Sequence, residues 1–302
     1  MVGATMELRR LGLSRKNLFV VPKATHGQFK NQFKDIYPYA DVLFPSEDDF
    51  SAGKRGEFIT RASTGDWDAI ILTGDQFRNI EVRPETERRF LTTEINELRA
   101  ALEAEIDENG KGRTSKAIEK AVEKAEVRLK NVADRLAAKH EHTINFEDLG
   151  IDQLFVDEAD NYKNLHFATR MGRLKGLPNS DSDRAFDMYM KTRTLQEQSN
   201  GQGVVFATGT PIANTVAEMY TMMRYLQEPM LESKGLQHFD TWAKTFGETT
   251  EGLEQNAAGK YLMTQRFSKF VNIPELSNIW QQTADIRVAD EVPAMRAEQP
   301  II

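Results

Sequence analysis

The stretch that most constrains this chain is the apolar run Leu154-Phe155-Val156, which leads directly into Asp157 and Glu158. Three consecutive apolar, strand-favouring residues are typical of a buried strand in a parallel sheet. In open α/β sheets, chemistry takes place just beyond the carboxyl ends of such strands. Two carboxylates at that position suit a nucleotide-bound Mg²⁺ and the orientation of an attacking water. Taken alone, the stretch fits a strand that ends in solvated acids equally well.

Two longer strings around this strand narrow the interpretation. The first, D-E-A-D-N-Y-K-N, begins at Asp157, and the second, A-T-G-T-P-I-A-N, begins at Ala207. Together they resemble the ATPase motor of superfamily-2 helicases, with its DEAD/DEAH-type Walker B string, and within it the Swi/Snf-type DNA translocases. The resemblance covers most of residues 1–230 and weakens beyond them. It implies an α/β, RecA-like fold of the P-loop NTPase type, with a mostly parallel sheet and helices on both faces.

The resemblance also implies roles for residues at the ends of these two strands. Asp157 would hold Mg²⁺ through water, and Glu158 would orient and deprotonate the water that attacks ATP. Thr208, Gly209 and Thr210 would couple the nucleotide state to the grip on DNA. Threonine and glycine at a strand end are also ordinary turn residues. The full eight-residue string makes the turn interpretation the weaker one.

Three residues at other strand ends are predicted contacts to the DNA backbone. Lys23 and Thr25 follow the apolar run 17–22 at the start of a predicted helix, whose free N–H groups suit phosphate. This unit resembles motif Ia of the family. Thr73 ends another predicted strand, 67–73, which resembles the strand that leads to motif Ib. An ordinary strand–helix unit explains the same residues without nucleic acid.

The best local basic patch lies between the two strings. Arg170, Arg173 and Lys175 stand within the polar segment 163–178. They are candidates for contact with a DNA backbone, and a flexible surface loop is the alternative. A local patch is needed because the 302-residue chain has a net charge of −7, so its overall charge does not favour nucleic acid.

Composition limits the other classes of function. The chain has no cysteine, which excludes disulfides, thiolate metal sites and thiol catalysis. Its apolar runs are far shorter than the roughly 20 residues of a membrane span. The N-terminus lacks the basic and apolar pattern of a secretory signal. These features predict a cytoplasmic protein that does not insert into membranes.

Residues 1–82 and 143–230 are predicted to form the motor lobe, and the segment 83–142 interrupts it. That segment carries thirteen acids and thirteen bases. Its apolar residues recur at helical spacing in two runs: Leu91, Ile95, Leu98 and Leu102, then Ile118, Val122, Ala125, Leu129, Val132 and Leu136. A Gly110-Lys111-Gly112 turn separates the runs. The pattern predicts an antiparallel coiled-coil hairpin that projects from the lobe as a solvated arm for a protein partner.

Residues 231–302 are predicted to form a mostly helical extension toward a second lobe. The aromatic residues there are expected to form a core, because aromatics at these spacings pack together more often than they stack on bases. No strand-rich pattern long enough for a second RecA-like lobe, with its arginine finger, follows the first lobe.

The phosphate-cradling string G-x-x-x-x-G-K-[ST] does not occur in this sequence. In the family it lies just before the helix with which this chain begins. The sequence therefore predicts a first motor lobe whose partners are the P-loop segment and the second lobe, and which is inactive by itself. The resemblance implies a large bacterial or phage protein that combines this motor with DNA methyltransferase modules.

Two other functions stay open at this point. A truncated lobe could act as a non-catalytic DNA-binding or protein-interaction module that hydrolyses nothing. An RNA helicase is the weaker rival, because RNA-directed relatives typically carry S-A-T where this chain has Thr208-Gly209-Thr210.

Overall fold

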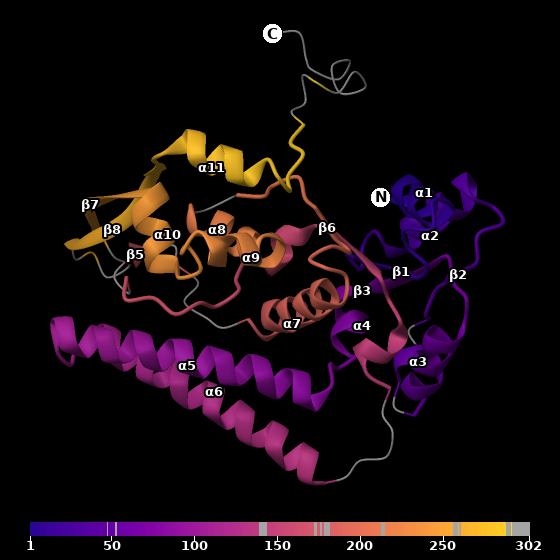
Figure 1. The fold of residues 1–302 in the computed structure, drawn as a ribbon, viewed down its shortest axis with the longest axis horizontal. Helices are drawn as coiled ribbons and strands as arrows, with labels where there is room; N and C mark the ends of the chain where they lie inside the picture. The colour runs from indigo at the N-terminus through magenta and orange to yellow at the C-terminus, as the bar shows by residue number, and fades with distance from the viewer. Residues whose placement is uncertain are drawn as a thin grey trace.

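The computed structural model shows an α/β fold with long helices packed beside a central sheet (Figure 1). It describes all residues except 47, 52, 139–143, 172–173, 176, 178–181, 213–214, 256–258, 260, 288–290 and 292–302.

The central sheet has five strands, all parallel, in the order β2-β3-β1-β4-β6. The strands are β1 (Asn17–Val21), β2 (Val42–Leu43), β3 (Ala69–Thr73), β4 (Gln153–Asp157) and β6 (Val204–Ala207). β1 lies at the centre, and every residue of β1 and β3 is buried. Strands buried on both faces need apolar residues at consecutive positions, as the sequence has them. The predicted parallel α/β sheet is confirmed.

Helices cover both faces of the sheet, because successive strand residues point to opposite sides. On one face, Phe19, Val21 and Phe155 pack against α1 (Val2–Arg10) and α2 (His26–Ile36). The rings of Phe19 and Phe155 stack with their centroids 4.9 Å apart. The other face carries the largest core. It packs against α3 (Arg55–Thr64), α4 (Gly74–Arg78) and α7 (Asp183–Gln198).

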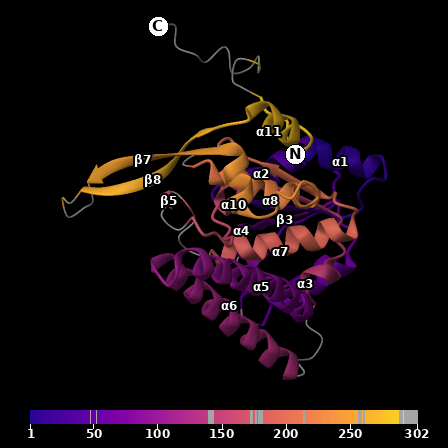
Figure 2. The ribbon, with the colours of Figure 1, turned by 60° about the vertical axis from the view of Figure 1, so that its left-hand side comes forward.

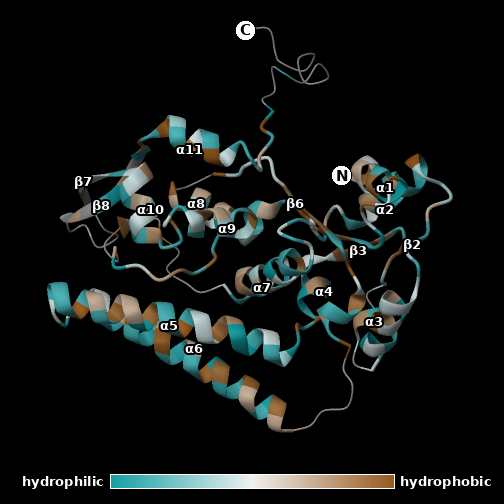
Figure 3. Ribbon diagram, viewed as in Figure 1, coloured by the Kyte–Doolittle hydropathy of each residue, from teal (hydrophilic) through white to brown (hydrophobic). Residues whose placement is uncertain are grey.

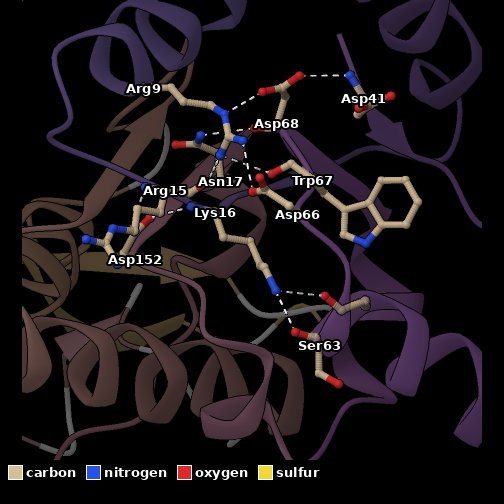
Figure 4. A network of polar contacts seen from close by, with 11 residues as sticks. Arg9, Arg15, Lys16, Asn17, Asp41, Ser63, Asp66, Trp67, Asp68 and Asp152 are labelled. Atoms are coloured by element: carbon tan, nitrogen blue, oxygen red, sulfur yellow. Dashed lines mark hydrogen bonds and ion pairs between the residues drawn. The ribbon is translucent and has the colours of Figure 1, made fainter.

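A polar network ties together the strand ends at the amino edge of the sheet (Figure 4). The Asp152 carboxylate, just before β4, accepts the backbone N–H groups of Arg15 and Lys16, just before β1, at 2.6 and 3.0 Å. The Lys16 ammonium donates to the last carbonyls of α3, where the helix dipole favours a cation. Arg9 pairs with Asp68, just before β3. These contacts hold three neighbouring strands in one register.

Within the segment 83–142, α5 (Pro84–Asn109) and α6 (Arg113–Ala137) form the predicted helical hairpin. Figure 3 shows hydrophilic residues along both helices. Leu98, Ile118 and Val122 pack within the seam. Leu91 and Val132, however, belong to the same core as the sheet. The expectation of an arm that simply projects is therefore wrong at its base, because some of its apolar residues are buried against the lobe. None of the described helices is long and apolar enough to cross a membrane.

A second hydrophobic core lies around α8 (Ala217–Leu226), α9 (Glu228–Ser233), α10 (Phe239–Phe246) and α11 (Ile273–Trp280). Aromatic rings fill it. Phe167 stacks on Phe239 at 4.3 Å, and Tyr220 lies 5.5 Å from Trp242. The predicted packing role is confirmed for Phe239, Trp242 and Phe246, which are fully buried, and wrong for Tyr261, which is 68% exposed.

The expectation that residues 231–302 are mostly helical is wrong for 247–255 and 261–270, which form strands. β7 (Gly247–Gln255) and β8 (Tyr261–Phe270) pair antiparallel and extend away from the body (Figure 2). β5 (Leu174–Lys175) pairs with β8 on the other side. A Cβ on Gly247 would lie 2.6 Å from the Phe267 ring, so a glycine is needed where the hairpin leaves α10.

One ion pair within α7, between Lys191 and Asp187, also contacts α4. Lys191, which is 0% exposed, donates to Asp187 and to the Phe77 carbonyl, both at 2.7 Å. Its ammonium also lies 4.2 Å from the centroid of the Phe77 ring. Burial lowers the pKa of Lys191 and raises the pKa of Asp187, and each charge opposes the shift of the other. The pair fixes α4 at the carboxyl edge of the sheet.

We expect Asp152→Ala to lower the free energy of unfolding by about 1–3 kcal/mol, because two backbone donors lose a charged acceptor. Asp66→Ala is the matched control, since the Asp66 side chain is 89% exposed and its partner is the Arg9 guanidinium. It should change stability by less than about 0.5 kcal/mol. Urea unfolding measures both, and equal effects would contradict the role of the Asp152 contacts.

We expect Lys191→Met to lower the free energy of unfolding by about 3–5 kcal/mol at pH 8, because Asp187 then keeps a buried charge without a partner. Burial raises the folded-state pKa of Asp187. The protonated form is therefore favoured in the folded variant, and the deficit should shrink as the pH falls from 8 toward 5. The double variant Asp187→Leu/Lys191→Met should recover most of the loss. A deficit that is the same at both pH values would refute this account.

Candidate functional site

The two strings singled out in the sequence end on neighbouring strands. β4 and β6 pair in parallel, with Asp157 opposite Ala207, so both strings leave the sheet side by side. The Thr208 hydroxyl donates to a carboxylate oxygen of Asp160 at 3.0 Å. The same hydroxyl accepts the backbone N–H of Thr210 at 3.0 Å. Asp160 lies in the first string, D-E-A-D-N-Y-K-N, and the sequence alone predicted no role for it. In the structure its carboxylate accepts the hydrogen bond of the Thr208 hydroxyl.

The two adjacent acids differ in their surroundings. Asp157 is half-buried, and burial raises its pKa, while the N–H of Glu158 and the positive amine of Met1 partly oppose that shift. The Glu158 side chain is exposed. Its slight desolvation and the neighbouring carboxylates of Asp160 and Asp157 raise its pKa. The backbone of Glu158 is left-handed, with φ 51°. This conformation is uncommon outside glycine and turns the chain sharply at the strand end, as strained residues at functional sites often do.

The loop after Glu158 is held firmly in place. The Asn161 amide donates to the Glu158 carbonyl at 2.9 Å, and Arg184 of α7 donates to the Asn161 carbonyl at 2.9 Å. Lys163 pairs with the buried Glu218 of α8 at 3.3 Å. The short helix η3 (Ala159–Tyr162) is therefore tied to two long helices.

A cavity of about 240 Å³ lies at the carboxyl ends of β1, β3 and β4. Its walls include Lys23, Thr73, Asp157, Tyr162 and Arg184. The structure therefore brings together three of the residues that the sequence predicted. Arg184 is an addition that sequence reasoning missed, because an arginine near the start of a helix carries no signal of its own.

The predicted threonine contacts have local structural roles. Thr73 is 8% exposed, and its hydroxyl accepts the Gln76 N–H at 3.3 Å in a capping box at the start of α4. Thr25 directly precedes α2, and its hydroxyl donates to the Pro22 carbonyl at 3.2 Å. Both residues lie where a helix begins at the carboxyl edge of the sheet, a position that offers N–H groups to anions.

Arg170, from the predicted basic patch, does not line this cavity. Arg170 pairs with Glu108 of α5 at 2.7 Å and with Asp240 of α10 at 3.4 Å, and it is absent from the cavity wall. Arg173 lies outside the described residues, as does the end of the second string, Ala213-Asn214.

The described residues contain no group of three or more His, Cys, Asp or Glu side chains that could hold a metal ion by itself. Asp157 offers one half-buried carboxylate. That donor fits Mg²⁺, which takes one or two protein carboxylates and otherwise keeps water and phosphate oxygens.

Comparison with known proteins gives one family and one relative. The chain is 26% identical over 231 residues to the "Defense against restriction protein B" of Escherichia phage P1. The aligned region covers 74% of this chain and 10% of that protein. The chain thus spans about a tenth of the length of this relative. No solved structure matches this chain significantly. Residues 1–288 match the family described as a probable helicase domain, and the chain belongs to that family.

Proposed function

We propose that this chain is the first motor lobe of an ATP-dependent DNA translocase or helicase of the Swi/Snf type. The observation that carries the proposal is the hydrogen bond between Thr208 and Asp160. It links the acidic string of β4 directly to the threonine string of β6, at the edge of the sheet where chemistry is expected. A translocase needs such a link between its nucleotide-binding site and the elements that bind DNA.

ATP and Mg²⁺ are the proposed cofactors. ATP would supply the phosphoryl group, and Mg²⁺ would partly neutralise the negative charge of its phosphate oxygens. Asp157 would hold the metal through water. Glu158, exposed beside it, would orient the attacking water and take its proton, for which a raised pKa is suitable. Thr208, Gly209 and Thr210 would pass the nucleotide state to the DNA contacts.

The free edge of the sheet supports a P-loop segment as partner. β6 pairs only with β4 among the described strands, and Val205 is 39% exposed on this edge strand. α1 and α2 cover the same face, and α2 leads from β1 toward β2. Connections between parallel strands are right-handed, so two connecting helices on the same face of a sheet lead the chain in the same direction across it. The connection through α2 leads from β1 toward β2, so a strand that precedes α1 would lie on the opposite side of β1, toward β6. Its loop into α1 would then lie at the carboxyl edge of the sheet, where Asp157 lies.

The proposed DNA track runs over the carboxyl edge, at Lys23, Thr25 and Thr73. A second lobe, outside this chain, would complete the clamp. Arg170 contributes to the internal bracing through Glu108 and Asp240 instead. The relative is named for defence against restriction, and we propose that the full protein containing this lobe acts on DNA in a comparable setting.

A non-catalytic DNA-binding or protein-interaction module is the second candidate. The observation in its favour is that this sequence lacks the string G-x-x-x-x-G-K-[ST]. The two proposals differ in what they predict for nucleotide turnover and for DNA.

We expect the chain to bind duplex DNA weakly, without sequence preference, at micromolar or higher concentrations in physiological salt. Lys23→Ala should weaken binding equally for two unrelated duplexes and reduce the salt slope by about one unit, because one phosphate contact is lost. Lys54→Ala, an exposed lysine beside α3, serves as the control. Fluorescence anisotropy at several salt concentrations measures this. A strong preference for one sequence, or a preference for RNA over DNA, would count against the translocase proposal.

We expect residues 1–302 to show no sustained ATP turnover, with or without duplex DNA. Both the P-loop lysine and the arginine finger are missing, and an arginine finger alone contributes about 10³–10⁵-fold in phosphoryl transfer. A coupled phosphate-release assay tests this, with Glu158→Gln as control. Robust turnover that Glu158→Gln abolishes would show that this chain is a complete catalyst and overturn the single-lobe proposal.

A further inference from the structure

A second cavity, of about 200 Å³, lies between the helical hairpin and the rest of the molecule. Its wall comes from α5, the segment 165–168, α7, α8 and α9. α5 passes beside α7 (Figures 1 and 2), and Arg89 of α5 pairs with Glu197 of α7 at 2.6 Å. Among the described residues, none lines both this cavity and the one at the carboxyl edge of the sheet. We call it the α5–α7 cavity.

The arginines of this wall are matched by carboxylates. Both oxygens of Glu228 lie within 2.7 Å of the Tyr189 hydroxyl, and Arg193 pairs with Glu228 at 2.9 Å. The Arg224 guanidinium lies 3.7 Å from Glu228 and donates to the Tyr189 hydroxyl at 3.1 Å. With the pair that joins α5 to α7, these contacts give each arginine of the wall an acidic neighbour.

The acids of α5 that are not exposed are Glu87, Glu94, Glu97 and Glu105. Two of them have partners within the hairpin. Glu87 pairs with Arg135, and Glu105 accepts the Asn109 amide at 3.0 Å. The other two, Glu94 and Glu97, line the cavity instead. They are three residues apart, so they lie on one face of α5.

These two carboxylates are left with little to balance them. The Glu94 side chain is 17% exposed, and its Oε2 has no hydrogen-bond partner among the described residues. Its Oε1 lies 3.7 Å from Nδ1 of His166. Burial raises the pKa of Glu97, Arg224 opposes that shift, and Glu228 and Glu94 add to it. The wall therefore holds more negative charge than its arginines match.

Arg224, in the same wall, lacks an acceptor. The residue is 9% exposed, and its Nη atoms donate to the His166 carbonyl at 3.2 Å and to Tyr189. Its Nε has no partner in the described part of the chain. A buried donor without an acceptor bears the full cost of its desolvation, which a ligand oxygen would relieve. Phe90 and Leu98 add apolar surface to the wall.

We propose that the α5–α7 cavity binds a small aliphatic ligand with ammonium groups and a carboxylate, the chemistry of a basic amino acid. An ammonium group has three donors and no acceptor, which suits Glu94 and Glu97. The ligand carboxylate is the acceptor that the Nε of Arg224 lacks. An aliphatic stem matches Phe90 and Leu98. The described residues offer no cluster of three metal-ligating side chains, which favours an organic cation over a metal ion.

This inference goes beyond the proposed function. A ligand in the cavity touches the hairpin, the lobe and the second core at once, because all three contribute to the wall. A ligand that binds only the folded arrangement stabilises it. The expectations for DNA and for nucleotide turnover do not depend on this site, so each proposal can fail without the other.

The test is isothermal titration calorimetry of the whole chain with L-lysine and two analogues. 1,5-Diaminopentane is lysine without its carboxylate, and 6-aminohexanoate is lysine without its α-ammonium group. We expect L-lysine to bind with a Kd of about 1 mM or lower, as a ligand of this size can. Each analogue should bind at least about tenfold more weakly, because one charged contact is lost. L-lysine that does not bind, or 1,5-diaminopentane that binds equally well, would overturn the inference.

A pair of variants places the ligand in the cavity. Glu94→Gln/Glu97→Gln should raise the Kd for L-lysine at least about tenfold, because both carboxylates lose their charge. Glu103→Gln/Asp107→Asn removes the same charge from exposed positions of α5 outside the wall and should leave the Kd unchanged. Circular dichroism checks that both variants keep their helices, and the analogue series on the unaltered chain decides the matter if one does not. Unchanged binding in the first variant, or an equal loss in both, would show that L-lysine binds elsewhere.

Discussion

The parallel pairing of β4 with β6 is the interaction on which the candidate site depends. It places Asp157 opposite Ala207, and so brings Thr208 within 3.0 Å of Asp160. Side-chain packing sets the register. Phe206 packs toward Tyr225, with ring centroids 5.2 Å apart, while Val205 points to the other face. A slip of one residue would exchange these two side chains and break the contact between the strings.

The fold followed from local patterns in the sequence because those patterns reflect burial. Residues 154–156 are apolar at every position, and all three are buried. Their side chains point alternately to the two faces of the sheet, so both faces are covered at this strand. The helical spacing in 84–137 corresponds to a real seam. The acids after β4 and the threonines after β6 could be placed at one edge because the carboxyl ends of parallel strands meet there.

Contacts between distant residues could not be predicted in the same way. Arg170 stands in a polar segment that suggested a nucleic-acid patch, yet its partners Glu108 and Asp240 come from two remote helices. The β7–β8 hairpin was missed because β7 is acidic and Leu253, Tyr261 and Met263 stay exposed. Sequence reasoning relies on one buried face per element, and of this ladder Phe267 and Phe270, near its base, pack against the second core.

Helix α7 explains how three separate sides of the site keep their places. Lys191 holds the end of α4 through the Phe77 carbonyl, and Arg184 holds the loop after Glu158 through the Asn161 carbonyl. The Tyr189 hydroxyl donates to Glu228 of α9, in the second core.

The Lys191 and Tyr189 side chains are buried, and there a lost partner costs far more than a surface contact provides. The contact of Arg184 lies at the surface. An apolar helix can slide by a small distance with little penalty, but a helix whose polar groups must meet fixed carbonyls and carboxylates cannot. These contacts fix α7 relative to the end of α4 and to the second core, and Arg184 links it to the loop after the acids. A site built on loops gains its precision from a scaffold of this kind.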